Sequence, residues 1–116
     1  MILLLDVASP IPEFHIINDN KIIYSSKIVQ NINQKLSDNI ISIYLNIKKA
    51  YNLNKHLTKL IVTTGPGSYT ALRVGASFIA GLSQSMNLPV SIISTETIYQ
   101  HLHNSCEKIG IYFESS

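Results

Sequence analysis

The stretch "VTTGPGSYTALRVG", residues 62–75, decides how the chain is interpreted, because an apolar run ends in it and a helical pattern begins. Residues 57–64, "LTKLIVTT", have the β-branched, apolar composition of a strand. Small residues then recur at helical spacing from Tyr69 to Met86 or Asn87, and Ser68 is placed to cap that helix. The stretch therefore predicts a strand, a tight turn in which Gly67 takes an unusual φ, and a helix.

The turn itself has the composition of an anion site, since a glycine-rich turn at a helix start offers free N–H groups. No lysine follows the glycines as a P-loop requires, and Gly65 and Gly67 do not fit the spacing of G-x-G-x-x-G or G-x-S-x-G. We interpret Gly65, Pro66 and Gly67 as a strand-to-helix turn, with anion binding as the alternative.

The helix after the turn is unusually rich in small residues, namely Ala71, Gly75, Ala76, Ala80 and Gly81. Each glycine costs a helix about 1 kcal/mol relative to alanine, so close approach of another backbone is expected to compensate. That backbone belongs either to the chain's own sheet or to a partner helix. Arg73, the single arginine beside eight lysines, indicates specific hydrogen bonds, either within the chain or to a partner.

The remaining pattern predicts one α/β domain with the order βββαβαβαβ over the 116 residues. Met1 to Val7 reads as a buried central strand, and Asn18, Asp19 and Asn20 suit a tight reversal between two further strands. Further elements are expected at these positions: a helix from Lys35 to Ala50, a strand at 90–93, a helix from Ser94 or Thr95 to His103, and a strand at 109–114.

Composition and charge narrow the classes of function. The formal net charge of +2 is small for a nucleic-acid-binding protein, and we interpret Lys48, Lys49, Lys55 and Lys59 as solvated lysines. Cys106 is the single cysteine, and no metal-binding spacing involves the histidines. The first residues lack the basic segment of a signal peptide, so a cytoplasmic protein is expected. Asp6 is interpreted as a capping or pairing residue.

Three segments together resemble the N-terminal lobe of the TsaB (YeaZ) family: "LLLDVAS", the "INDNK" hairpin and "TTGPGSYTALRVGASFIAGL". The match is specific at the motif residues Asp6, Gly65, Pro66, Gly67, Ser68, Thr70, Arg73 and Gly75. The resemblance implies an RNase H-like fold of the actin/Hsp70-kinase superfamily. It covers nearly the whole chain but only about half of a usual family member, which implies that residues 1–116 form a single lobe without the family's C-terminal lobe.

The resemblance also implies a function. Family members are non-catalytic subunits that bind TsaD, the catalytic subunit of threonylcarbamoyladenosine (t6A) formation at A37 of tRNA, and they also self-associate. We expect a TsaD-like partner or a homodimer, no cofactor, no metal, no membrane and no direct binding of nucleic acid by the chain alone. The hypothetical partner-binding residues are Ala71, Leu72, Gly75, Ala76, Ile40, Tyr44 and Ile47. The alternatives are a helper of another partner, a glycoprotease-like or ATPase relative, and a truncated or decaying product.

Overall fold

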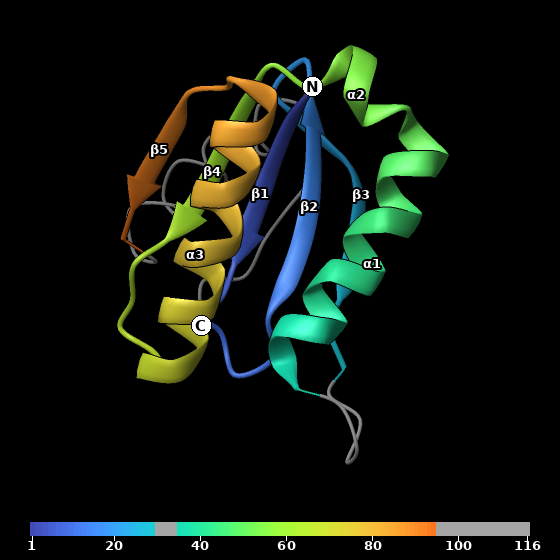
Figure 1. The fold of residues 1–116 in the computed structure, drawn as a ribbon. Coiled ribbons are helices and arrows are strands. Elements are labelled where there is room, and N and C mark those ends of the chain that lie inside the picture. Colours follow the sequence, from blue (N-terminus) through green and yellow to red (C-terminus); the bar gives the residue numbers. More distant parts are fainter. Residues whose placement is uncertain (30–34, 95–116) are drawn as a thin grey trace.

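The computed structural model describes residues 1–29 and 35–94 and shows a mixed five-stranded sheet with helices on one face (Figure 1). The strand order is β3-β2-β1-β4-β5. The strands span Ile2–Asp6 (β1), Glu13–Asn18 (β2), Lys21–Lys27 (β3), Lys59–Thr63 (β4) and Val90–Ile93 (β5). The helices are α1 at Leu36–Tyr51, the single turn α2 at Leu53–His56, and α3 at Tyr69–Met86.

The central strand is β1, which pairs antiparallel with β2 and parallel with β4. Its alternate residues Leu3 and Leu5 are fully buried under the helices, as expected for a strand covered on that face. Strand β5 continues the parallel half beside β4, and β3 continues the antiparallel half beside β2. The predicted meander of the first three strands and the predicted central position of the first strand are both confirmed.

The β2–β3 hairpin turns at Asp19 and Asn20, whose φ angles are 54° and 62°. Aspartate and asparagine tolerate this left-handed region better than most residues, so the local sequence accounts for the turn. The register shifts between Ile16 and Ile17, where the ladder contains a bulge or irregularity.

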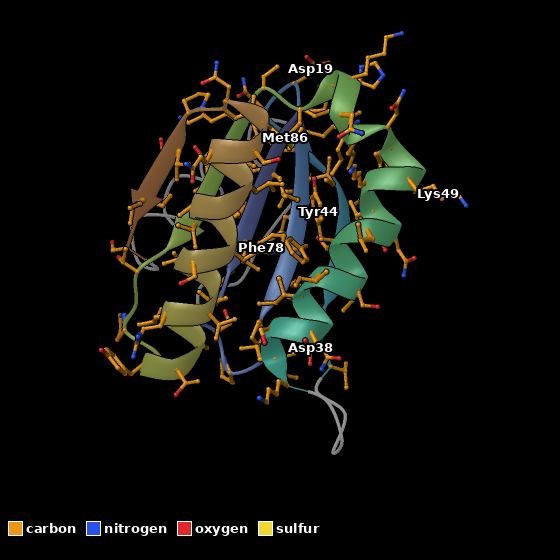
Figure 2. The ribbon with its side chains drawn as sticks, in the orientation of Figure 1. Asp19, Asp38, Tyr44, Lys49, Phe78 and Met86 are labelled. Atoms are coloured by element: carbon orange, nitrogen blue, oxygen red, sulfur yellow. The ribbon has the colours of Figure 1, made fainter. Side chains whose placement is uncertain are left out.

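Helices α1 and α3 pack side by side over the sheet, and an aromatic cluster joins them. The ring of Phe14, on β2, lies 6.4 Å from that of Tyr44 on α1 and 6.1 Å from that of Phe78 on α3. The Tyr44 and Phe78 rings are 5.3 Å apart at 69°, an edge-to-face arrangement that suits aromatic quadrupoles. Figure 2 shows both rings between the two helices, and the Tyr44 hydroxyl donates to Met86 Sδ at 3.7 Å.

The predicted boundaries hold to within one or two residues for α1, α3, β4 and β5. The helical turn α2 was not predicted, so the described order has one more helical element between α1 and β4 than expected. Asn52 ends α1 and immediately precedes α2. Its φ of 51° lies in the left-handed region, which asparagine tolerates, so this helix end does not need a glycine. The predicted helix to His103 and the strand at 109–114 lie outside the described residues.

Candidate partner-binding surface

The turn between β4 and α3 is shaped by two glycines with different roles. Gly65 has φ of 120°, which favours glycine, and the Gly65–Pro66 peptide bond is cis. A Cβ added to Gly67 would lie 2.8 Å from both Cα and the carbonyl oxygen of Ala8. The prediction that Gly67 carries the unusual φ is therefore wrong: Gly65 does, and Gly67 is required because the Ala8 backbone lies against it.

Ser68 caps α3, as the sequence predicted. Its backbone is extended, and its Oγ accepts a hydrogen bond from the Ala71 N–H at 3.4 Å. Such a cap satisfies one of the helix's free donors and typically stabilises by about 1 kcal/mol. Thr70 follows in the first turn and is exposed.

The small residues of α3 divide between two faces. Gly75 is buried, and its missing Cβ would lie 2.7 Å from Cγ1 of Val7, so this side of α3 rests on the end of β1. Ala71 is buried on the same side, and Leu72 is half-buried against the core. In this structure Ala71, Leu72 and Gly75 contact the chain's own core, and their contact with a partner stays a prediction. Ala76 is exposed.

Three predicted partner residues of α1 are likewise in the core. Ile40 is fully buried, and Tyr44 and Ile47 are at most 5% exposed. All three belong to the hydrophobic core, and their contact with a partner stays a prediction. The exposed apolar residues of α1 are instead Ile41 and Leu45, which are 47% and 52% exposed and lie one turn apart.

The outer surface between α1 and α3 contains a groove with a cavity volume of about 590 Å³. Ser37 and Ile41 of α1 line one wall. The other wall comes from α3 and consists of Tyr69, Thr70, Arg73, Val74, Ser77 and Phe78. Tyr69 is 73% exposed, and the floor of the groove reaches the aromatic cluster through Phe78. The surface can therefore accept an apolar side chain from another molecule.

Arg73 stands at the rim of this groove. Its Cζ lies 5.6 Å from the centroid of the Tyr69 ring, a cation–π geometry. The hydrogen bonds that the sequence predicted within the chain are absent among residues 1–29 and 35–94, and the side chain is exposed. The guanidinium thus lies against the Tyr69 ring at an exposed position of the groove.

Asp6 is a structural residue at the end of β1. It is 4% exposed, and its carboxylate accepts from the Ala8 N–H at 3.1 Å, from the Thr63 hydroxyl at 3.3 Å and from the Ser9 hydroxyl at 2.6 Å. These bonds fix the chain where it leaves β1, in the segment whose Ala8 backbone lies against Gly67. The interpretation of Asp6 as a capping or pairing residue agrees with this geometry, in which its carboxylate accepts hydrogen bonds from the chain end of β1.

The sheet face opposite the helices carries a polar cluster that the sequence analysis did not identify. His15 is 7% exposed, its Nδ1 lies 2.7 Å from Ser25 Oγ, and its Nε2 lies 3.4 Å from a Glu13 carboxylate oxygen. Burial lowers the pKa of His15 below its usual 6.5, and the charges of Glu13 and Asp6 act in the opposite direction. The alternation of β2 could have indicated this, since His15 faces away from Phe14 and Ile16.

The described residues contain neither a metal-binding cluster nor a membrane-spanning helix. No group of three or more histidine, cysteine or acidic side chains is arranged to hold a metal ion there. No helix in the same residues is long and apolar enough to cross a bilayer. The most distinctive surface feature in this part of the chain is therefore the α1–α3 groove with its exposed arginine and apolar residues.

Comparison with known proteins decides the family. The model of the family "TsaD: tRNA N6-adenosine threonylcarbamoyltransferase" matches residues 23–108, which is well over half of the chain. The chain belongs to this family. Within the family it is TsaB/YeaZ-like, which confirms the resemblance found in the sequence. A relative from Bacillus subtilis (strain 168), the tRNA threonylcarbamoyladenosine biosynthesis protein TsaB, is 41% identical over 39 residues, or 34% of this chain and 17% of the relative.

Solved structures confirm the fold of this family member. YeaZ from Pseudomonas aeruginosa superposes with a TM-score of 0.70 at 15% identity, covering 94% of this chain and 49% of YeaZ. A second structure, described as an uncharacterized protein with similarity to peptidase YEAZ from Pseudomonas aeruginosa, has a TM-score of 0.71 with the same identity and coverage. The chain thus has the RNase H-like fold and spans about half the length of these structures.

Proposed function

We propose that this chain is a non-catalytic, TsaB-like subunit that binds a TsaD-like catalytic subunit and supports t6A formation at A37 of tRNA in the cytoplasm. The observation that carries the proposal is the outer face of the helix layer. It exposes Ile41 and Leu45 beside a groove that is lined in part by the exposed Arg73. Membership of the family supports t6A formation as the pathway in which the chain acts.

The contact set that we propose from the structure differs from the residues expected from the sequence. We propose Ile41, Leu45, Tyr69, Arg73, Val74 and Ala76 as contacts, because these side chains are exposed or half-exposed on α1 and α3. Ala71, Gly75, Ile40, Tyr44 and Ile47 act indirectly by holding the helices on the sheet. An apolar centre with a cationic rim is the composition that favours a specific interface.

We also propose that the chain corresponds to the N-terminal lobe of the longer TsaB-like proteins. Supporting this, the aligned region covers 94% of this chain and only 49% of YeaZ. A single lobe with the described α1–α3 face retains the whole of the proposed docking surface.

Co-elution tests the proposal. The chain is mixed with the TsaD of its own organism and passed over a size-exclusion column. We expect a complex that elutes ahead of both components and that sustains t6A formation on tRNA lacking the modification. Separate elution at concentrations well above ~10 μM, where a specific interface should be occupied, would contradict it.

Self-association is the second candidate, and the exposed stripe of α1 favours it. Asp38, Ile41, Leu45 and Lys48 follow one another at helical spacing. In an antiparallel pair of α1 helices related by a two-fold axis at residue 43, Ile41 would face Leu45 and Asp38 would face Lys48 of the second copy. Such a face is complementary to itself, as a two-fold interface requires.

A further inference from the structure

One end of the molecule collects most of the described lysines. Lys59 begins β4 beside Ile2, Ile2 pairs with Ile17, and the β2–β3 turn ends at Lys21. Helix α1 finishes at the same end with Lys48 and Lys49, and α2 adds Lys55. The amino group of Met1 donates to the His56 carbonyl at 2.9 Å, which fixes α2 at the start of β1. We define Lys21, Lys48, Lys49, Lys55 and Lys59 as the basic end.

Most of the described acidic residues lie at the end of the molecule opposite the basic end. Asp6, Glu13 and Asp38 lie at the other end of the sheet and helix layer, and among the described residues Asp19 alone is acidic at the basic end. Figure 2 shows Asp19 and Lys49 at one end and Asp38 at the other. Lys27 and Lys35 lie at that other end together with these acidic residues, so the excess positive charge of the described residues is concentrated at the basic end, where five lysines accompany the single acidic residue Asp19.

The lysines of the basic end are available to a ligand. Lys21, Lys49 and Lys55 are exposed, and Lys48 and Lys59 are partly exposed. None of them takes part in an ion pair within residues 1–29 and 35–94, where the ion pair present is that of His15 with Glu13. Lysines at a helix C-terminus also complement its dipole, but Lys21 and Lys59 belong to strands and have no such role.

We propose that the basic end contacts the phosphate backbone of RNA. The choice of RNA rests on the proposed function, because a subunit acting in tRNA modification works beside a polyanion. Lysine–phosphate contacts carry no base specificity and release counterions, so they position an RNA without reading its sequence. Tyr24 and Tyr51, whose rings lie 5.4 Å apart between β3 and the end of α1, border this surface. This replaces the expectation, based on net charge, that the chain alone binds no nucleic acid.

The experiment measures binding of fluorescently labelled, unmodified tRNA to the full chain by anisotropy. Wild type, Lys49→Gln/Lys55→Gln and Lys27→Gln/Lys35→Gln are compared from about 50 to about 200 mM salt. The two double variants remove the same charge from exposed lysines at opposite ends. We expect Lys49→Gln/Lys55→Gln to bind at least about five-fold more weakly at low salt and to reduce the salt slope by about two. The control pair should stay within two-fold of wild type.

Three results would overturn the inference: no tRNA binding by wild type at low salt, equal weakening by both pairs, or preferential binding to anionic phosphatidylglycerol vesicles over tRNA. Co-elution with TsaD is measured on the same variants. If co-elution persists while the tRNA result fails, the basic end is wrongly assigned and the proposed function stands. If co-elution fails while wild type binds tRNA through the basic end, the proposed partner is wrong and the surface assignment stands.

Discussion

The Cβ that Gly75 lacks would lie 2.7 Å from Cγ1 of Val7, so α3 and the end of β1 are in contact without room for a methyl group. Gly67 has the same relationship with the Ala8 backbone one residue further along the chain. Together the two contacts seat the first half of α3 on the segment that leaves β1. The position of Arg73 and of the groove depends on this seating.

Gly75→Ala is expected to destabilise the fold by about 1–3 kcal/mol, because the added methyl overlaps both Val7 methyl groups. Gly81→Ala is the matched control, since nothing lies within 4 Å of its added Cβ and the site is exposed. That variant should gain up to about 1 kcal/mol from helix propensity. Urea unfolding of both proteins checks the pair. Stabilisation of the chain by Gly75→Ala would show that α3 does not rest on Val7.

Stability should fall as the pH drops below about 6.5, because burial lowers the pKa of His15 in the folded chain. The unfolded chain then binds more protons than the folded chain, and the free energy of unfolding decreases toward the lower folded pKa. A single histidine can change the free energy of unfolding by at most about 1.4 kcal/mol for each pH unit. His15→Asn should show a shallower loss between pH 7 and pH 5 in urea titrations. An unchanged slope would exclude His15 as the source.

Arg73→Lys is expected to leave the free energy of unfolding within about 0.5 kcal/mol of wild type, since the described residues offer the guanidinium a stacking contact at an exposed site. The substitution keeps the charge but loses the planar fork that would bind a partner's carboxylate. Affinity for TsaD should therefore fall by about 1–3 kcal/mol, measured by calorimetry. A large loss of stability with unchanged affinity would place the role of Arg73 inside the chain.

Charge exchange on α1 separates self-association from binding to TsaD. In the antiparallel pair, Asp38→Lys puts like charges opposite each other and should weaken the homodimer measurably in sedimentation equilibrium. The double variant Asp38→Lys/Lys48→Asp restores the opposite charges and should restore the homodimer. If the double variant associates no better than the single one, the α1 helices do not pair in this register.

Local features were predictable from the sequence because they depend on neighbouring residues. The cap at Ser68, the turn at Asp19 and Asn20, and the bounds of α3 follow from local backbone chemistry and periodicity. The single turn α2 was missed because a four-residue helix is too short for a periodic signal.

The direction in which the small residues of α3 face was not predictable, because a sheet and a partner helix both favour glycine at a close contact. Only the position of Val7 shows that Gly75 faces inward and that Gly81 faces outward. The partner-binding residues hypothesised from the sequence differ from the exposed apolar residues for a related reason. The apolar periodicity of α1 identified its buried stripe, at Ile40, Tyr44 and Ile47, whereas the exposed Ile41 and Leu45 lie beside it.

Titration of TsaD against Ile41→Asp and Ile11→Asp tests the central claim most directly. The two isoleucines are 47% and 48% exposed, so both substitutions remove a similar exposed side chain, one at the proposed interface and one in the β1–β2 connection. We predict that Ile41→Asp weakens binding by at least ~2 kcal/mol, as at an interface hot spot, while Ile11→Asp binds like wild type. Equal affinity of the two variants for TsaD would contradict the assignment of the α1–α3 face.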